Sequence, residues 1–309
     1  MKENRLPTIT PVRAQRTTFG VADVLALGLA IVWGSNFVIV KQALAELSPL
    51  AFNGLRFVGA SLFLLLVLRL KGEDWRIERA DVPRMVVLAL ISITAYQVCF
   101  IFGLSLSTAT NTSLIIATSP SLVVVFGAAF GLTRATRRTW IGVLMALAGL
   151  LLVVGGKQQG LSIGSDTLLG DILAFGSAVT WAIYTLYVPP LSKRYTPLKA
   201  TTVIMAIGAV PLVFLSVPDL LRQDWGRVTM ASWGGLLFST VMSIALGYVV
   251  YYICVKMLGG ARGAAYFNLP PVFSVLLAFL LLGERMTIWQ AAGAAIVVLG
   301  VYLTRRNTG

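Results

Sequence analysis

Residues 23–33 have the sequence Asp-Val-Leu-Ala-Leu-Gly-Leu-Ala-Ile-Val-Trp, and residues 171–181 have Asp-Ile-Leu-Ala-Phe-Gly-Ser-Ala-Val-Thr-Trp, 148 positions later. The same offset places Ser-Pro-Leu at 48–50 against Thr-Pro-Leu at 196–198. Later matches drift to offsets of 152 and 151, as unequal loops between repeated units produce. The chain is therefore predicted to contain two copies of one hydrophobic unit.

The composition assigns these units to a lipid environment. Hydrophobic residues make up 57% of the chain, charged residues 12%, and the mean hydropathy is +0.85, unlike a soluble domain. Ten apolar stretches are each long enough, at roughly 17–25 residues, to cross the hydrocarbon layer as a helix, and such continuous runs argue against a β-barrel. They lie near residues 22–41, 49–68, 84–104, 110–130, 138–155, 170–191, 199–217, 231–255, 263–282 and 288–304.

The five predicted spans of each unit have a geometric consequence. An odd number of crossings makes the second unit start on the opposite side of the membrane, so the repeats are inverted, as in many secondary transporters. The predicted fold class is an all-α polytopic membrane protein with ten transmembrane helices in two inverted five-helix repeats. We expect a cytoplasmic tail at residues 1–19, without the apolar core of a signal peptide, and repeats at residues 20–156 and 168–305.

The basic residues indicate the orientation of the chain. Its 25 Lys and Arg against 12 Asp and Glu give a net charge of +13. With the amino terminus in the cytoplasm, nineteen basic residues fall on the inner side, five on the outer side, and Arg56 alone falls well inside a span. Because this asymmetry follows the positive-inside rule, we attribute the charge to topology rather than to nucleic-acid binding, and we place both termini in the cytoplasm.

The sequence lacks the residues that several kinds of chemistry require. The chain contains no His, which excludes His-based catalysis, His metal ligands and His proton relays. It has no glycine-rich phosphate-binding loop, and by this topology no Asp or Glu lies in the middle of a span, where proton-coupled carriers commonly place one. We predict no enzyme activity, no cofactor and no metal. Facilitated diffusion or exchange is favoured, with proton coupling through the substrate left open.

Arg56 is the strongest single candidate for a substrate contact. It lies about seven residues into its span, or about 10 Å deep at the helical rise of ~1.5 Å per residue. A charge at such a depth costs on the order of 2.5–3.5 kcal/mol, so it requires compensation. One interpretation is a cation that meets a substrate carboxylate. The alternatives are snorkelling to the outer interface and pairing with backbone carbonyls.

Aromatic and polar side chains recur at matched positions of the two units. Trp33 is followed three residues later by Asn36, and Trp181 by Tyr184, which places each pair on one helical face. These pairs are candidate walls of a substrate site between the repeats. Ordinary helix packing with an interhelical hydrogen bond is the alternative.

Three further tyrosines lie too deep in their spans for an interfacial belt. Tyr96, Tyr248 and Tyr251 have hydroxyls that need partners, and together with the tryptophans they would suit an amphipathic organic solute better than a bare ion. Aromatic residues at helical spacing are also common in ordinary cores.

The spans at 110–130 and 263–282 carry the remaining candidates. Asn111 and Asn268 are predicted to supply hydrogen bonds to a cavity. Pro120, Pro270 and Pro271 are predicted to permit bending at a gate, because proline removes a backbone hydrogen bond. The alternative is that small residues nearby only let these helices approach closely.

The chain resembles the drug/metabolite transporter superfamily, in its branch built from two EamA-type repeats. The resemblance covers about residues 20–305. It rests on the acidic helix start with Trp ten residues later, on the prolines above, and on Leu-Gly-Glu-Arg at 282–285. It implies ten helices, cytoplasmic termini and a central cavity. The first repeat lacks a match to Glu284, so we interpret that residue as structural.

Within this superfamily the chain looks most like bacterial exporters of amino acids, including aromatic ones. We therefore expect an inner-membrane secondary transporter that exports small amphipathic metabolites, with amino acids as the leading class, by alternating access. The alternatives are a multidrug or nucleotide-sugar carrier of the same superfamily and, less favoured, a channel or a membrane enzyme. The expected partners are a small-molecule substrate and the lipid bilayer. The oligomeric state stays open, and a monomer is compatible with the sequence.

Overall fold

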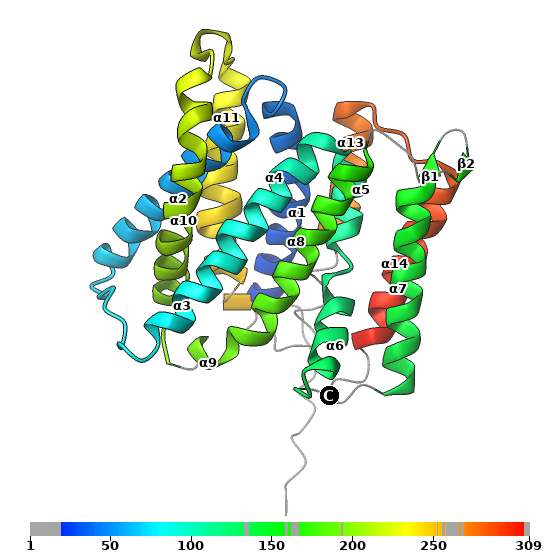
Figure 1. The fold of residues 1–309 in the computed structure, drawn as a ribbon, viewed down its shortest axis with the longest axis horizontal. Helices are drawn as coiled ribbons and strands as arrows, with labels where there is room; N and C mark the ends of the chain where they lie inside the picture. The colour runs from blue at the N-terminus through cyan, green and yellow to red at the C-terminus, as the bar shows by residue number, and fades with distance from the viewer. Residues whose placement is uncertain are drawn as a thin grey trace, which may run out of the picture.

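The computed structural model describes residues 20–132, 136–157, 160–161, 167–192, 194–251, 253–254, 257, 266 and 269–305. Most of this part of the chain is helical, and two strands of two residues each form one short antiparallel pair (Figure 1). The first repeat contains α1 (Val21–Ala43), α2 (Pro49–Leu70), α3 (Val82–Ala89), η1 (Leu90–Ala95), α4 (Tyr96–Leu106), α5 (Ala109–Ile116), α6 (Ser119–Ala129), α7 (Arg137–Gly155) and β1 (Gly156–Lys157). The rest comprises β2 (Gly160–Leu161), α8 (Leu168–Tyr187), α9 (Pro189–Ser192), α10 (Pro197–Arg222), η2 (Trp225–Arg227), α11 (Met230–Phe238), η3 (Ser239–Leu246), α13 (Pro270–Leu282) and α14 (Ile288–Arg305).

The predicted fold class is confirmed. In the described part of the chain, eight helical segments are long and apolar enough to cross a membrane, and the last two predicted spans are the shorter apolar helices α13 and α14. Some spans combine several elements: α3, η1 and α4 form one continuous crossing at Val82–Leu106, and α5 and α6 together form another at Ala109–Ala129.

The repeated Ser-Pro-Leu and Thr-Pro-Leu stretches start the second helix of each repeat. Ser48 and Thr196 are the N-cap residues of α2 and α10, and each is followed by a proline in the first helical turn. Proline is tolerated there because the first backbone N–H groups of a helix have no intrahelical partner. The Thr196 hydroxyl in addition accepts a hydrogen bond from the backbone N–H of Lys199. The sequence match therefore marks equivalent helix starts.

The two repeats run in opposite directions and interlock. In Figure 1, α1 runs from bottom to top and α8 from top to bottom. The second helices α2 and α10 pack together, and so do α7 and α14. The first helix of each repeat lies against the fourth span of the other, because α1 packs on α13 and α8 on α5 and α6. Each repeat thus completes the packing of its partner.

Glycines bring α7 and α14 into close contact. A Cβ atom added at Gly149 would lie 2.6 Å from the backbone oxygen of Gly293, and one added at Gly293 would lie 2.7 Å from the backbone oxygen of Gly149. In lipid, helices associate through close packing rather than through a hydrophobic driving force. This seam is therefore a structural scaffold at the periphery of the molecule (Figure 1).

Replacing Gly149 by alanine is expected to destabilise the protein by about 1–3 kcal/mol, because the added methyl group meets backbone atoms that cannot rotate away. Thermal unfolding of the purified protein in detergent measures this loss. Gly28→Ala is the matched control, since Gly28 also lies in a spanning helix but a Cβ there has no atom within 4 Å. Equal unfolding temperatures for the two variants would contradict this account of the seam.

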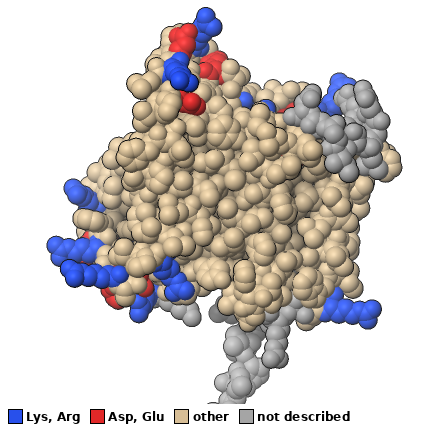
Figure 2. All heavy atoms as spheres, in the orientation of Figure 1, with Lys and Arg blue, Asp and Glu red and all other residues tan. Residues whose placement is uncertain are grey.

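The surface separates an apolar belt from charged ends. Figure 2 shows Lys, Arg, Asp and Glu gathered toward the two ends of the molecule, with other residues between them. Large apolar side chains are exposed along the belt, including Leu62, Leu66 and Phe214, the last with 74% of its surface accessible. Exposed apolar surface of this extent is typical of a protein surrounded by membrane lipid.

At each end of the molecule, a loop of one repeat contacts a loop of the other repeat. At one end Asp81, at the start of α3, accepts hydrogen bonds from Arg194 at 2.8 Å and from the Tyr195 hydroxyl at 2.7 Å. At the other end Glu46 accepts a bond from the backbone N–H of Thr229 at 2.8 Å. The first loop of each repeat thus contacts the second loop of the other. Additional contacts at the Asp81 end join Thr196 to Glu73 and Lys199 to Asp74.

The Asp81 contact has a defined pH dependence. The hydrogen bond from Tyr195, followed by that from Arg194, holds the pKa of Asp81 below its ordinary value of 3.8. A lowered pKa in the folded state stabilises the protein above the unfolded-state pKa, and this contribution is lost as the pH falls through the folded-state pKa.

We expect the difference in unfolding temperature between the wild type and Asp81→Asn to stay constant from about pH 8 to about pH 5 and to shrink below pH 3.8. Thermal unfolding in detergent across this range measures it. Asp224→Asn is the control, because Asp224 pairs with Arg227 on an exposed turn, where ion pairs contribute little. A difference that grew on acidification would contradict the assigned sign.

Candidate functional site

Six aromatic side chains form one cluster where the two repeats meet. Trp181 is its centre, with ring centroids 5.5 Å from Tyr96, 5.6 Å from Tyr184, 5.9 Å from Tyr248 and 6.0 Å from Tyr251. Trp33 completes the cluster, at 6.2 Å from Tyr248 and 5.6 Å from Tyr251. The structure therefore brings these six predicted site residues together from four helical spans of both repeats. We call this group the aromatic cluster.

A π-helical segment precedes a cluster tyrosine in each repeat. Segment η1 ends immediately before Tyr96, and η3 ends two residues before Tyr248. Wide turns of this kind are rare and occur frequently at functional sites. The Trp33 indole donates a 3.0 Å hydrogen bond to the Ser243 carbonyl within η3, and Gly247 permits this approach, since a Cβ there would lie 2.8 Å from the indole nitrogen.

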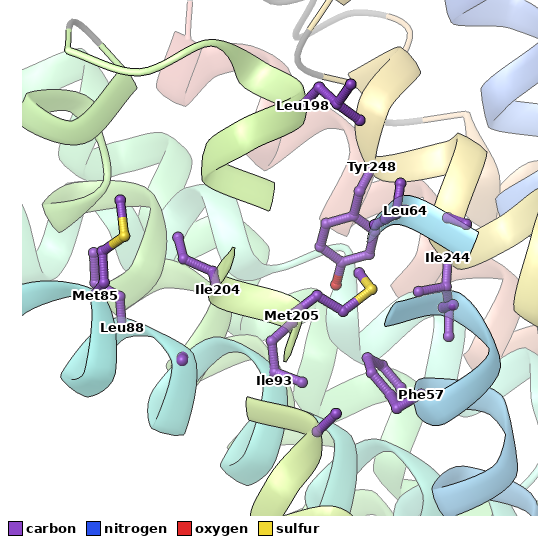
Figure 3. Close-up of a cluster of buried hydrophobic side chains, with 14 of the residues drawn as sticks. Phe57, Leu64, Met85, Leu88, Ile93, Leu198, Ile204, Met205, Ile244 and Tyr248 are labelled. Atoms are coloured by element: carbon purple, nitrogen blue, oxygen red, sulfur yellow. The ribbon is translucent and has the colours of Figure 1, made fainter. Parts of the chain in front are cut away.

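Part of the cluster rests on a hydrophobic core. Tyr184 and Tyr248 are buried, whereas Trp33, Trp181 and Tyr251 are half-buried and pack against the same core. Figure 3 shows Tyr248 projecting with its hydroxyl end toward Met205 and Phe57. The cluster thus combines buried rings with half-buried ones.

Arg56 lies beside the cluster in a buried hydrogen-bond network. Its side chain is 1% exposed. Nη2 donates to Asn53 Oδ1 and to Gln97 Oε1, both at 2.6 Å, and Nη1 donates to Ser239 Oγ at 3.0 Å. The Ser239 hydroxyl in turn donates to Asn36 Oδ1 at 2.7 Å. We call these five residues the Arg56 network.

The Arg56 network compensates the buried charge without a carboxylate. The guanidinium carbon lies 5.3 Å from the ring centroid of Phe52, 5.4 Å from that of Phe57 and 5.6 Å from that of Phe100, distances at which cation–π attraction operates. Among the described residues no Asp or Glu forms an ion pair with Arg56, and Arg56 Nε has no hydrogen-bond partner there. Within the described part of the chain, the buried guanidinium neither snorkels to the interface nor pairs with backbone carbonyls.

Phe100 connects the two parts of the site. Its ring contacts the Arg56 guanidinium and stacks on Tyr96, with centroids 6.0 Å apart and an interplanar angle of 10°. A positive charge therefore adjoins the aromatic cluster.

Asn111 lies in a different network near one end of the molecule. Its side chain donates to Asp171 at 3.4 Å and accepts from Gln290 at 2.9 Å. Asp171, the acidic residue of the repeated sequence motif, also accepts a bond from Ser107. The structure does not bring Asn111 together with the aromatic cluster. Asn268 lies outside the described residues.

The three predicted gating prolines lie at helix starts. Pro120 is in the first turn of α6, after the interruption that separates α5 from α6, and Pro270 and Pro271 are in the first turn of α13. The Pro270 carbonyl lies close to Gly34 of α1, where an added Cβ would approach it to 2.6 Å. Their role in gating stays a prediction.

Two charged residues stabilise the break between α4 and α5. Glu284 accepts hydrogen bonds from the backbone N–H groups of Ala109 at 2.9 Å and Thr110 at 3.0 Å, at the first turn of α5. The Lys41 ammonium donates to the carbonyls of Leu104 and Ser107 at the end of α4. Each charge complements the local helix dipole. These contacts support a structural role for Glu284, and Lys41 serves as a cap.

Sequence reasoning did not select three members of the Arg56 network. Asn53 precedes Arg56 by three residues on the same helix, a spacing that places both on one face and that offered a usable signal. Gln97 and Ser239 come from other spans, and nothing in the sequence pairs them with Arg56.

Among the described residues, eight helical segments long and apolar enough to cross a membrane and two shorter apolar helices, arranged in two repeats, define a polytopic membrane protein. A model of the EamA-like transporter family matches residues 20–155 and 168–306. The chain belongs to this family, and it is a transporter rather than an enzyme.

Similar proteins are known from bacteria and archaea. An uncharacterized transporter of Bacillus subtilis, YyaM, is 28% identical over 282 residues, which cover 90% of this chain and 91% of YyaM. An uncharacterized transporter of Archaeoglobus fulgidus is 30% identical over 277 residues, covering 89% and 93%. A protein of Salmonella typhimurium named "Probable amino-acid metabolite efflux pump" is 24% identical over 292 residues, covering 90% and 93%.

The same fold occurs among solved structures, and one crystal structure serves as an example. It superposes with a TM-score of 0.67 at 17% sequence identity, covering 93% of this chain and 99% of the other.

Proposed function

We propose that this protein exports small amphipathic metabolites that carry a carboxylate, with amino acids, including aromatic ones, as the leading class. The observation that carries the proposal is the buried Arg56, which has no acidic partner among the described residues and adjoins an aromatic cluster from both repeats. A substrate carboxylate would supply the missing negative charge, and the aromatic cluster would contact the apolar part of the substrate.

The mode of transport that we propose is alternating access with facilitated diffusion or exchange. The two repeats are inverted and pack against each other. Such a pair can adopt one arrangement that opens toward one side of the membrane and an equivalent one that opens toward the other. No Asp or Glu belongs to the aromatic cluster or the Arg56 network, as far as the structure describes the chain. A proton-coupling group of the usual kind is therefore not part of the proposed site.

We place the protein in the bacterial inner membrane with both termini in the cytoplasm. The basic excess on the predicted inner side supports this orientation, and the bacterial transporters among the relatives are consistent with it. The Asp81 docking contact would then lie on the cytoplasmic face.

Uptake into proteoliposomes tests the proposal. The panel contains labelled amino acids, purine metabolites, nucleotide sugars and lipophilic cations, each assayed with and without an imposed pH gradient. We expect amino acids to exchange without a gradient. Movement of lipophilic cations alone would favour a multidrug carrier, movement of nucleotide sugars alone would favour that class, and complete dependence on the gradient would overturn facilitated transport.

A further inference from the structure

Ser239 connects the two repeats through hydrogen bonds. It lies at the start of η3 in the second repeat and is fully buried. Its hydroxyl accepts a hydrogen bond from Arg56 and donates one to Asn36, both of which belong to the first repeat. One hydroxyl group therefore joins α2, α1 and the eighth span.

The direction of these two bonds is fixed by chemistry. A guanidinium can only donate, so the Ser239 oxygen accepts from Arg56, and the single hydroxyl hydrogen is left for Asn36 Oδ1. The other two acceptors of Arg56, Asn53 and Gln97, come from its own repeat. Ser239 is thus the acceptor that ties Arg56 to the opposite repeat.

A carboxylate that binds Arg56 competes with these neutral acceptors. Charge-assisted hydrogen bonds to a carboxylate are shorter and about twice as strong as those between neutral groups. The Ser239 bond is the longest of the three to Arg56, at 3.0 Å against 2.6 Å for the other two. If a substrate oxygen replaced the Ser239 hydroxyl as the acceptor for Arg56, a polar contact between the repeats would be lost while the substrate is bound.

We infer that Ser239 is the positioning residue through which carboxylate binding at Arg56 is coupled to the contact between the two repeats. This inference rests on the proposed function, since it takes Arg56 as the carboxylate-binding group. Ser239 itself does not contact the substrate. It holds Arg56 in the unloaded state, and the substrate must displace it.

Substitution of Ser239 by alanine should tighten carboxylate binding. Because the competing acceptor is absent, the Kd for L-phenylalanine or L-leucine is expected to fall by about tenfold, which corresponds to about 1.4 kcal/mol. Binding of the matching amino-acid amides, which lack the carboxylate, is expected to stay unchanged. The maximal rate of exchange should decrease, because the substitution stabilises the substrate-loaded state relative to the unloaded state.

The experiment measures ligand binding to the purified full-length protein and exchange in proteoliposomes. Ser239→Thr keeps the hydroxyl and should behave like the wild type. Ser92→Ala is the matched control: Ser92 is a buried serine in the other π-helix, and its hydroxyl has no partner among the described residues. If Ser239→Ala is not recovered folded, Asn36→Ala serves instead, with a smaller expected gain of about threefold because the hydroxyl loses its orientation.

Each result decides the inference. Selective tightening for carboxylates supports it. Unchanged binding, or equal changes in the Kd values for carboxylates and amides, overturns the inference. In that case the proposed function still stands if the wild type exchanges amino acids. Failure of the wild type to bind either amino acid overturns the inference and the amino-acid proposal together.

Discussion

Transport of carboxylate-bearing metabolites is expected to fall by about a hundredfold when Arg56 is replaced by glutamine. Hydrogen bonds to charged groups contribute about 1.5–3 kcal/mol each, and 2.8 kcal/mol corresponds to about a hundredfold. Glutamine can still donate to one neighbouring acceptor, but it carries no charge for a carboxylate. Initial rates of counterflow in proteoliposomes, normalised to the reconstituted amount of protein, measure the effect.

Arg56→Lys separates charge from geometry. Lysine keeps a positive charge but lacks the planar arrangement of donors, so it cannot hold Asn53, Gln97 and Ser239 as the guanidinium does. We expect a rate between those of the wild type and Arg56→Gln. Arg69→Gln is the control on the same helix, because Arg69 is exposed in the last turn of α2 and should have no effect. Wild-type rates for Arg56→Gln would exclude Arg56 from substrate binding.

The features that sequence predicts well here are local or repeated. Apolar length, the Ser-Pro and Thr-Pro helix starts and the repeated motif predict the spans and their inversion, because each depends on one segment and its membrane environment. Arg56 was also identifiable, since a charge within a spanning helix always requires an explanation. The aromatic residues were identifiable for the same reason, as polar hydroxyls and indoles deep in apolar helices.

The features that sequence could not predict depend on tertiary contacts. The π-helical turns before Tyr96 and Tyr248 have no pattern of apolar residues that distinguishes them from regular helix. Asn111 shows its polarity in the sequence, but its partners Asp171 and Gln290 come from other spans. Polarity in a membrane helix therefore indicates that a partner exists, while the choice between substrate and protein is made by packing.

Trp181→Ala is expected to reduce transport of aromatic substrates at least tenfold. It should destabilise the protein by less than the about 3–5 kcal/mol that deleting a fully buried aromatic side chain costs, because Trp181 is half-buried. Trp181 contacts four other rings of the cluster, and such aromatic pairs contribute about 0.5–1.5 kcal/mol each. Trp33 contacts two, so Trp33→Ala should have the smaller effect despite the matched positions. Counterflow and thermal unfolding measure the two quantities.

The comparison between substrates distinguishes recognition from folding. Trp181→Phe keeps a ring for Tyr96 and Tyr248 but presents a smaller face, so we expect near-normal stability together with a preference shifted from aromatic toward aliphatic amino acids. Trp140→Ala is the control, because Trp140 is 40% exposed on α7, away from the cluster. A loss in Trp181→Phe that is equal for phenylalanine and leucine would show that the cluster only supports the fold. A selective loss would assign it to the apolar part of the substrate, beside the charge that Arg56 provides.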